Sequence, residues 1–461
     1  MSLHSRGAVY NPSMMHGFIL FVFFLATSWD FIVQGLKLPG IVRFLPEASS
    51  AIIVVYALIA GTRTRFRYVA PKYWLVFTAL GLVIVCGIVN NDPGTGPLIT
   101  GLRFCFRAVP LFFLPAVLPT SEKQLRTQLN VLLACAFAQV PISMYQRWVI
   151  LDAGRYSGDG VQGSLMDSGI LTMFLICAAL VLTGFLLKHR IGKLKYFLIF
   201  LVLLFPTTIN ETKATVIFLP VGLIVTLLVG AEPGKRLRYA GLAVGLLTVF
   251  AAIFIPIYDK MEEGDPNRID IVDFFSNEKQ LSQYLVANEK GRGAGLGSVR
   301  PAHRGESISV PLHYLAKDPV KLAFGLGLGN SSPSQSGKNF EGNYYRLFTG
   351  LLVTSFSYFL LEFGVLGVSL IGVLFWLVFA DSMAVAREDT GIHGALAAGF
   401  TGIVALFIIS TAYNCYHLFT SMTFLYWYFS GLVCARRAEL RYASAPAVVR
   451  PARTALLNTA S

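Results

Sequence analysis

Apolar segments long enough to cross a bilayer recur along the whole chain, and a single long polar stretch interrupts them. A helix needs roughly 20 apolar residues to cross a hydrocarbon core of about 30 Å. We predict such helices at 15–35, 48–61, 73–90, 97–118, 127–149, 166–187, 195–209, 213–230, 239–257, 351–380, 392–413 and 416–434. Between Tyr258 and Gly350 the sequence is polar and charged instead. The expected fold is therefore an all-α polytopic membrane protein of about 12 transmembrane helices, with one large loop between the ninth and the tenth.

The composition supports a membrane protein rather than a soluble one. Hydrophobic residues make up 55% of the chain, the mean hydropathy is +0.62 and charged residues are 14%, against about 25% in soluble domains. The six cysteines lie in or beside apolar segments without metal-ligand spacing, so they are expected to be small core residues. The net charge of +13 is attributed to basic cytoplasmic loops, which are common in membrane proteins. No nucleic-acid partner is expected.

Basic residues gather in alternate connections between the predicted helices and so set an orientation. The basic set includes Arg63, Arg65, Arg67, Lys72, Lys123, Arg126, Lys188, Arg190, Lys193, Lys195, Lys235, Arg236, Arg238, Arg436, Arg437 and Arg441. Connections of the opposite set, such as 90–96 and 413–417, contain no Lys or Arg. The positive-inside rule then places both termini in the cytoplasm and the large loop on the outer side. Four regions are predicted: helices 1–9 (1–257), the large loop (258–350), helices 10–12 (351–434) and a disordered cytoplasmic tail (435–461).

Two arginines lie inside a predicted membrane helix, where ionisable residues are costly and usually functional. Arg103 and Arg107 are four residues apart, so they share one face of the fourth helix, in its outer half. Each guanidinium group can donate two hydrogen bonds to one phosphate, so the two arginines suit a diphosphate bound near the outer leaflet. The alternative is that they snorkel outward or pair with a carboxylate such as Asp30.

Further charged residues lie in the outer connections. Glu211 and Lys213 share the tight turn between the seventh and eighth helices, where they form either a local ion pair or part of the same outer cavity. Arg155 precedes the sixth helix, and Asp167 is expected to cap that helix. Glu362, inside the tenth helix, is expected to have a structural role.

The large loop carries basic residues, a histidine and a glycine run. Most of its charges are expected to form a solvated surface, and Arg292 and Arg300 are candidates for additional substrate contacts. His313 is either a packed residue or a base or ligand. The glycines of 325–329 lack the Gly-Lys-Ser/Thr of a phosphate loop. They predict a tight backbone path where the loop returns to the membrane surface.

Four stretches, in chain order, resemble motifs of the O-antigen ligase and polysaccharide polymerase superfamily of bacterial membrane glycosyltransferases. They are Arg155–Gly158 (Arg-x-x-Gly in the family), Thr212–Thr215 (Ser-Arg-Gly-Ala), Arg304 fifteen positions before the Pro319–Gly329 segment, and Leu361–Gly367 (Glu-x-Gly-x-x-Gly). The resemblance covers about residues 97–380. Family ligases also carry His-Asn about nine positions before the Glu, which the corresponding stretch 353–357 lacks. Lys213 replaces the usual arginine. It keeps the positive charge but lacks the planar guanidinium, which can donate two hydrogen bonds to one phosphate.

The resemblance implies transfer of a glycan from an undecaprenyl-diphosphate donor to a sugar hydroxyl at the periplasmic face of a bacterial inner membrane. Arg155, Arg304 and Lys213 would then bind the donor diphosphate together with Arg103 and Arg107. The sequence has no Asp-x-Asp or His-cluster ligand set, so guanidinium groups are expected to stabilise the leaving group without a metal or cofactor. A direct displacement would invert the anomeric centre. The expected partners are the donor, the growing glycan, the bilayer and, as further candidates, a chain-length regulator and a flippase.

Two residues are candidates for the general base, and several functions stay open. Histidine ordinarily titrates near neutrality, and His313, on a helix, would come within reach of Arg304, whereas Glu211 would need a pKa raised by burial against the effect of Lys213. The leading hypothesis is a polymerase of lipid-linked repeat units. The alternatives are an O-antigen ligase acting on lipid A-core, another lipid-linked transferase such as the peptidoglycan polymerase type, and, from a different class, a polysaccharide or lipid transporter or flippase. The large outer loop and the absence of an internal repeat disfavour the transporter.

Overall fold

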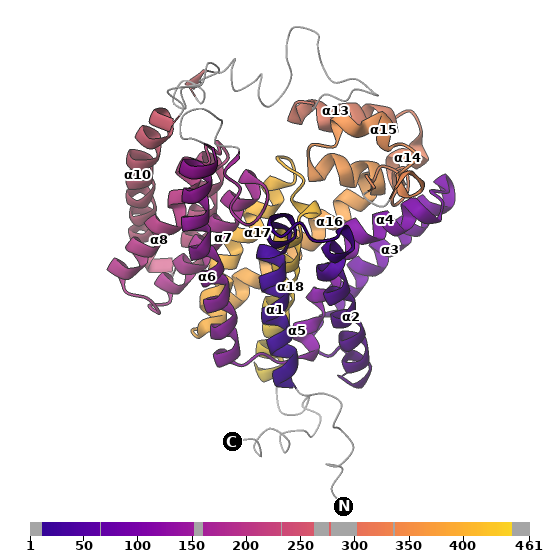
Figure 1. Ribbon diagram of the computed structural model, residues 1–461. Helices are drawn as coiled ribbons and strands as arrows, with labels where there is room; N and C mark the ends of the chain where they lie inside the picture. Colours follow the sequence, from indigo (N-terminus) through magenta and orange to yellow (C-terminus); the bar gives the residue numbers. More distant parts are fainter. Residues whose placement is uncertain are drawn as a thin grey trace, which may run out of the picture.

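The computed structural model describes residues 12–64, 66–151, 160–231, 233–261, 276–277, 302–334 and 337–444. Every regular element in this part of the chain is a helix (Figure 1). Long apolar helices dominate, as expected of a membrane-embedded protein. The prediction of an all-α fold is therefore confirmed for the described residues.

A helix or a helix pair occupies each of the predicted positions. They are α1 (Pro12–Gly35), α2 (Leu45–Thr64), α3 (Pro71–Asn91), α4 (Thr95–Phe106) with α5 (Leu114–Val117), α6 (Glu122–Tyr145), α7 (Ser168–Leu187), α8 (Lys193–Ile209), α9 (Thr215–Gly230), α10 (Arg236–Met261), α16 (Ser355–Glu388), α17 (Ile392–Ser410) and α18 (Thr420–Ser444). Nine segments of the described chain are long and apolar enough to cross a membrane, and α9 is a shorter apolar helix of 16 residues. The number of membrane spans and their orientation stay predictions.

The molecule has two distinct ends (Figure 1). Three short helices, α13 (Arg304–Leu315), α14 (Pro319–Phe324) and α15 (Tyr345–Phe348), gather at one end, here named the α13 end. α1 begins and α18 ends at the opposite end, here named the terminal end. α7 and α17 pack closely in the bundle, because a Cβ on Gly399 would lie only 2.6 Å from Cα of Val181.

The described part of the polar stretch between α10 and α16 folds around a small apolar core. The side chains that form this core are Leu315, Leu326, Phe348, Leu351, Leu360 and Leu361. Burying apolar area is what allows a segment of this kind to hold a fixed structure. The core joins α13, α14 and α15 to the start of α16.

The glycine run lies tightly against the membrane helices, as predicted. Gly325, Gly327 and Gly329 have φ values of +74°, +88° and +91°, a region that glycine adopts readily and other residues rarely do. A Cβ on Gly327 would lie 2.8 Å from the carbonyl oxygen of Gly87 in α3. A larger residue could not follow this backbone path without displacing α3.

Glu362 holds the glycine run in place. Its buried carboxylate accepts hydrogen bonds from Ser331 N at 2.9 Å and from Ser331 Oγ at 2.6 Å, and another from Gly329 N. Two residues later Gly364, with φ +65°, interrupts the helical backbone of α16. The structural role expected for Glu362 fits this geometry, since a buried carboxylate without such donors would be costly.

The C-terminal boundary differs from the prediction, because α18 continues past residue 434 to Ser444. Arg436 stabilises the added turns: its Nε donates to Asp389 Oδ2 at 2.8 Å and its Nη1 to Glu439 Oε2 at 3.0 Å. Burial works to raise the pKa of Asp389, but the hydrogen bonds from Arg436 and from Gly391 N outweigh it and lower the pKa. The rest of the predicted tail, 445–461, lies outside the described residues.

Candidate functional site

Arg103 and Arg107 meet on one carboxylate. Arg107 Nη1 lies 2.8 Å and Arg103 Nη2 lies 3.0 Å from Oε1 of Glu47 in α2, and Arg103 Nε donates to the same oxygen at 3.2 Å. The shared helix face predicted for the two arginines is confirmed. The carboxylate that binds both of them is Glu47 rather than the Asp30 suggested by the sequence.

These charges line a cavity of about 360 Å³, a size within the usual range of ligand pockets. Its polar and charged lining residues include Ser28, Asp30, Gln34, Glu47, Arg103, Arg107, Ser164 and Ser421. Two of the polar atoms, Glu47 Oε2 and Arg107 Nε, are buried and have no hydrogen-bond partner within the described residues. Buried polar groups are normally satisfied, so these two atoms indicate bonding capacity for a ligand.

Arg107 also contacts the loop between α17 and α18, residues 411–419, here named the α17–α18 loop. Its Nη2 donates to the carbonyl oxygen of Leu418. Arg304, at the start of α13, donates from Nε to the carbonyl oxygen of Tyr413 at 3.0 Å, and its guanidinium lies 4.0 Å from the centre of the Tyr413 ring. The structure thus brings two of the cations expected at the donor diphosphate, Arg107 and Arg304, to the two ends of one loop.

Glu211 forms a buried ion pair with Arg147, a partner that the sequence did not predict. Its Oε1 lies 2.7 Å from Nη2 of Arg147, just after α6, and the two side chains are 7% and 1% exposed. Phe218 of α9 packs against Tyr413 with 5.2 Å between ring centres, so the turn that carries Glu211 lies beside the α17–α18 loop. Sequence reasoning missed Arg147, because an arginine at the end of an apolar helix is common.

α13 separates His313 from Arg304 instead of bringing them together. Arg304 begins the helix and His313 lies near its end. A spacing of nine residues corresponds to about 13.5 Å along the axis and to opposite faces of the helix. His313 is also exposed to solvent. The expected helix is present, but the expected short distance between the two side chains is wrong.

The remaining predicted residues are Asp167, Lys213 and three arginines. Asp167 caps α7 as predicted, since its Oδ1 accepts a hydrogen bond from the backbone N–H of the third helical residue at 2.8 Å. Lys213 is half-buried in the turn before α9. Arg155, Arg292 and Arg300 lie outside the described residues, so their roles stay predictions.

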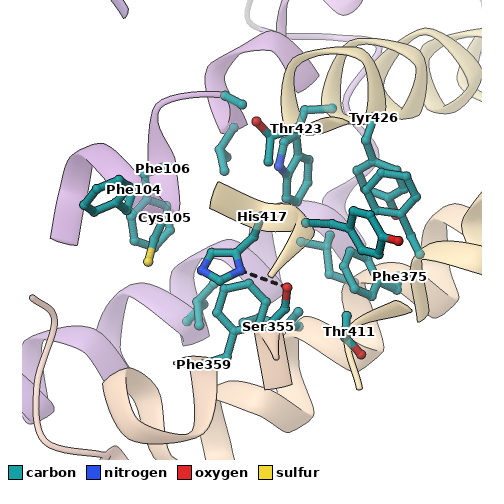
Figure 2. A pocket seen from close by; sticks show the side chains of 18 of the residues that line it. Phe104, Cys105, Phe106, Ser355, Phe359, Phe375, Thr411, His417, Thr423 and Tyr426 are labelled. Carbon is teal, nitrogen blue, oxygen red and sulfur yellow. Dashed lines mark hydrogen bonds between the residues drawn. The ribbon is translucent and has the colours of Figure 1, made fainter. Parts of the chain in front are cut away.

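His417 of the α17–α18 loop lies beside Ser355, the first residue of α16 (Figure 2), and no sequence motif pointed to this histidine. Its ring packs against Tyr358 and Phe359, with distances between ring centres of 4.6 and 4.5 Å. Nδ1 lies 2.8 Å from Ser355 Oγ, whose single proton goes to the carbonyl oxygen of Asn414. The histidine must therefore donate from Nδ1–H, which leaves Nε2 as a buried acceptor without a partner in the described chain.

Its surroundings keep His417 neutral. Burial, and then the positive charge of Arg107, lower the pKa of His417 to about 3. Figure 2 shows the ring beside an apolar cavity of about 70 Å³, whose lining includes Phe104, Cys105, Phe375 and Tyr426. Phe104 also lines the cavity at Arg107, so the two cavities adjoin each other.

No protein-family model matches the chain, and no curated protein is significantly similar to it. The resemblance to O-antigen ligases and polysaccharide polymerases therefore rests on its four motifs. Within the residues that the structure describes, no group of three His, Cys, Asp or Glu side chains could hold a metal ion.

Proposed function

We propose that the protein polymerises lipid-linked oligosaccharide repeat units, transferring glycan from an undecaprenyl-diphosphate donor to a sugar hydroxyl at the periplasmic face of a bacterial inner membrane. The observation that carries this proposal is the cavity of about 360 Å³ with Arg103 and Arg107 in its wall. Arg304, from one of the four family-like motifs, binds the same α17–α18 loop as Arg107. The product would be an exopolysaccharide, a capsule or an O-antigen.

The arginines supply the charge that the leaving group needs. As the acceptor hydroxyl oxygen attacks the anomeric carbon, the bond from that carbon to the phosphate oxygen breaks and the lipid diphosphate leaves with the electron pair. Arg103 and Arg107 present forked donors that stabilise this developing charge. Both arginines are engaged by Glu47 in the structure, so the diphosphate competes with that carboxylate. The displacement inverts the anomeric centre and needs no metal or cofactor.

Glu47 is the best placed residue to accept the proton of the hydroxyl. It lines the cavity, and its Oε2 is buried without a partner in the described chain. His313 is exposed near the end of α13, and Glu211 is held in its ion pair with Arg147. A positioned general base contributes about 10²–10⁴-fold to the rate. We therefore place Glu47 ahead of His313 and Glu211 for this role.

The direct test is an assay with purified protein and a synthetic undecaprenyl-diphosphate repeat unit, whose products are separated by size. A polymerase gives a ladder of glycans that differ by one repeat unit, with an inverted linkage at each new bond. Release of undecaprenyl diphosphate without a longer glycan would contradict the proposal.

A second candidate, the O-antigen ligase, is favoured by one observation. Family ligases carry His-Asn shortly before the Glu of the Glu-x-Gly-x-x-Gly motif. Here Nδ1 of His417 and the main-chain carbonyl oxygen of Asn414 contact Oγ of Ser355, seven residues before Glu362, from the α17–α18 loop. The assay separates the two functions when lipid A-core is offered as the acceptor. A ligase transfers glycan to it in a single step, whereas a polymerase leaves it unmodified.

A further inference from the structure

A further cavity, here named the second cavity, lies between α6, α7, α8, α17 and α18, and at one end it shares Phe407 and Tyr426 with the small cavity beside His417. Its volume is about 390 Å³, and it shares no described lining residue with the cavity at Arg107. Along α17 it extends from Ile392 to Phe407, which corresponds to about 22 Å at 1.5 Å per residue. One leaflet of the hydrocarbon core is about 15 Å thick. The cavity is therefore long enough to take an acyl chain.

The wall of this second cavity is mostly apolar. Its aliphatic and aromatic lining residues include Phe174, Val181, Phe185, Leu396, Ile403 and Phe429. Empty apolar space of this size lacks the dispersion contacts of a packed interior. An apolar chain restores those contacts, whereas a small soluble anion does not.

The mouth of the second cavity is basic. Arg126 near the start of α6, Arg190 before α8 and Lys195 in the first turn of α8 line the end at which α6, α8 and α17 begin. All three side chains are exposed, and none of them forms an ion pair with a carboxylate of the described chain. Arg190 Nη2 donates to the carbonyl oxygen of Thr390 at 3.0 Å, which holds its guanidinium at the mouth. No Asp or Glu is among the described lining residues.

We propose that this cavity binds one anionic phospholipid, with its phosphate at Arg126, Arg190 and Lys195 and one acyl chain along α17. Basic pockets between membrane helices at a cytoplasmic face suit anionic headgroups in this way. The mouth lies toward the terminal end, where α6 begins, whereas the cavity proposed for the donor diphosphate is lined by Pro333, between α14 and α15 of the α13 end (Figure 1). The occupant is therefore a lipid of the other leaflet and not the donor, and its binding does not depend on the proposed transferase activity.

The test measures thermal unfolding of the full-length protein in neutral detergent with increasing dioleoylphosphatidylglycerol or dioleoylphosphatidylcholine. Phosphatidylglycerol should raise the Tm in a saturable manner, because a ligand that binds only the folded state stabilises it. Phosphatidylcholine, which has no net charge, should have a much weaker effect. The variant Arg126→Gln/Arg190→Gln/Lys195→Gln should bind phosphatidylglycerol on the order of 100-fold more weakly, about fivefold for each charge removed.

The matched control is Lys123→Gln/Lys193→Gln/Arg238→Gln, because these cations are exposed at the same end but do not line the cavity. It should keep the wild-type response. Ala178→Phe, which places a ring inside the cavity, should lose the response to phosphatidylglycerol. Equal loss in the two triple variants would mean general attraction to a basic surface and would overturn the proposal. A response to undecaprenyl diphosphate in place of phosphatidylglycerol would overturn it as well.

Discussion

Arg107 Nη1 lies 2.8 Å from Oε1 of Glu47, so the cation that follows α4 and a carboxylate of α2 form one ion pair in the wall of the cavity of about 360 Å³. Glu47 also binds Arg103, so a single carboxylate holds two guanidinium groups. An anion that enters the cavity can take over either guanidinium without leaving a cation unpaired. The pair therefore has the properties of a preformed anion site.

Arg107→Ala should lower the transfer rate by about 100-fold, a usual cost of removing one donor to a developing anion. Arg107→Lys should recover little of this loss, because a lysine keeps the charge but cannot make the forked contact. The measurement is donor consumed per minute at equal amounts of folded protein.

The matched control for Arg107 is Arg346→Ala. Arg346 pairs with Glu341 at 2.7 Å, but its side chain is 71% exposed. Exposed pairs contribute little, so this variant should stay close to the wild-type rate. Equal losses in Arg107→Ala and Arg346→Ala would show that the cavity has no special role.

Glu47→Gln should reduce turnover by about 10²–10⁴-fold, because an amide cannot accept the proton. Donor affinity should rise at the same time, since Arg103 and Arg107 would lose a competing carboxylate. A titration with labelled donor and a turnover assay measure the two effects separately. At equal amounts of folded protein, His313→Ala and Glu211→Gln should keep their turnover; the amounts must be matched because Glu211→Gln also removes the partner of the buried Arg147. Loss of turnover in one of these two, with Glu47→Gln still active, would assign the base to that residue instead.

Arg147→Met should destabilise the fold by about 3–5 kcal/mol, because it removes the guanidinium that pairs with the buried carboxylate of Glu211. Arg147→Met/Glu211→Gln should lose less stability than Arg147→Met alone, since it leaves no carboxylate uncompensated. Denaturation in detergent, followed by circular dichroism, measures both variants. A double variant that is less stable than Arg147→Met would show that the two side chains are not coupled in this way.

Acid should weaken the fold through His417. Its pKa in the folded protein is about 3, below the value of about 6.5 in an unfolded chain. As the pH falls below about 6.5, the unfolded chain binds a proton that the folded protein does not. Stability is therefore lost progressively from about pH 6.5 towards pH 3. The Tm should fall less steeply with acid in His417→Gln than in the wild type, and parallel curves would contradict the burial of this ring.

Hydropathy located the helices but not all of their ends. α18 continues to Ser444 because Arg436 binds Asp389, which lies in the connection between α16 and α17. The apolar core of the large loop joins Leu315 of α13 to Leu360 of α16. Contacts of this kind connect residues far apart in the sequence, and no local pattern contains them.

The cations of the candidate site could be predicted from the sequence, whereas their partners could not. Arg103 and Arg107 are conspicuous because charge inside an apolar segment is costly. Glu47 and Arg147 lie near helix ends, where charged residues are common. His417 had one local signal, its place in a short polar break without Lys or Arg between two apolar segments. That signal does not show what the histidine contacts.

One measurement on proteoliposomes separates glycan transfer from lipid transport. The wild-type protein and Arg107→Ala are reconstituted with a fluorescent undecaprenyl-diphosphate repeat unit in the presence of EDTA, and both new glycan and donor movement across the membrane are followed. We expect a ladder of longer glycans from the wild type, little product from Arg107→Ala and no movement of donor across the membrane. Movement of donor without any new glycosidic bond would contradict a membrane glycosyltransferase, and a ladder that forms only after Mg²⁺ is added would contradict a metal-independent one.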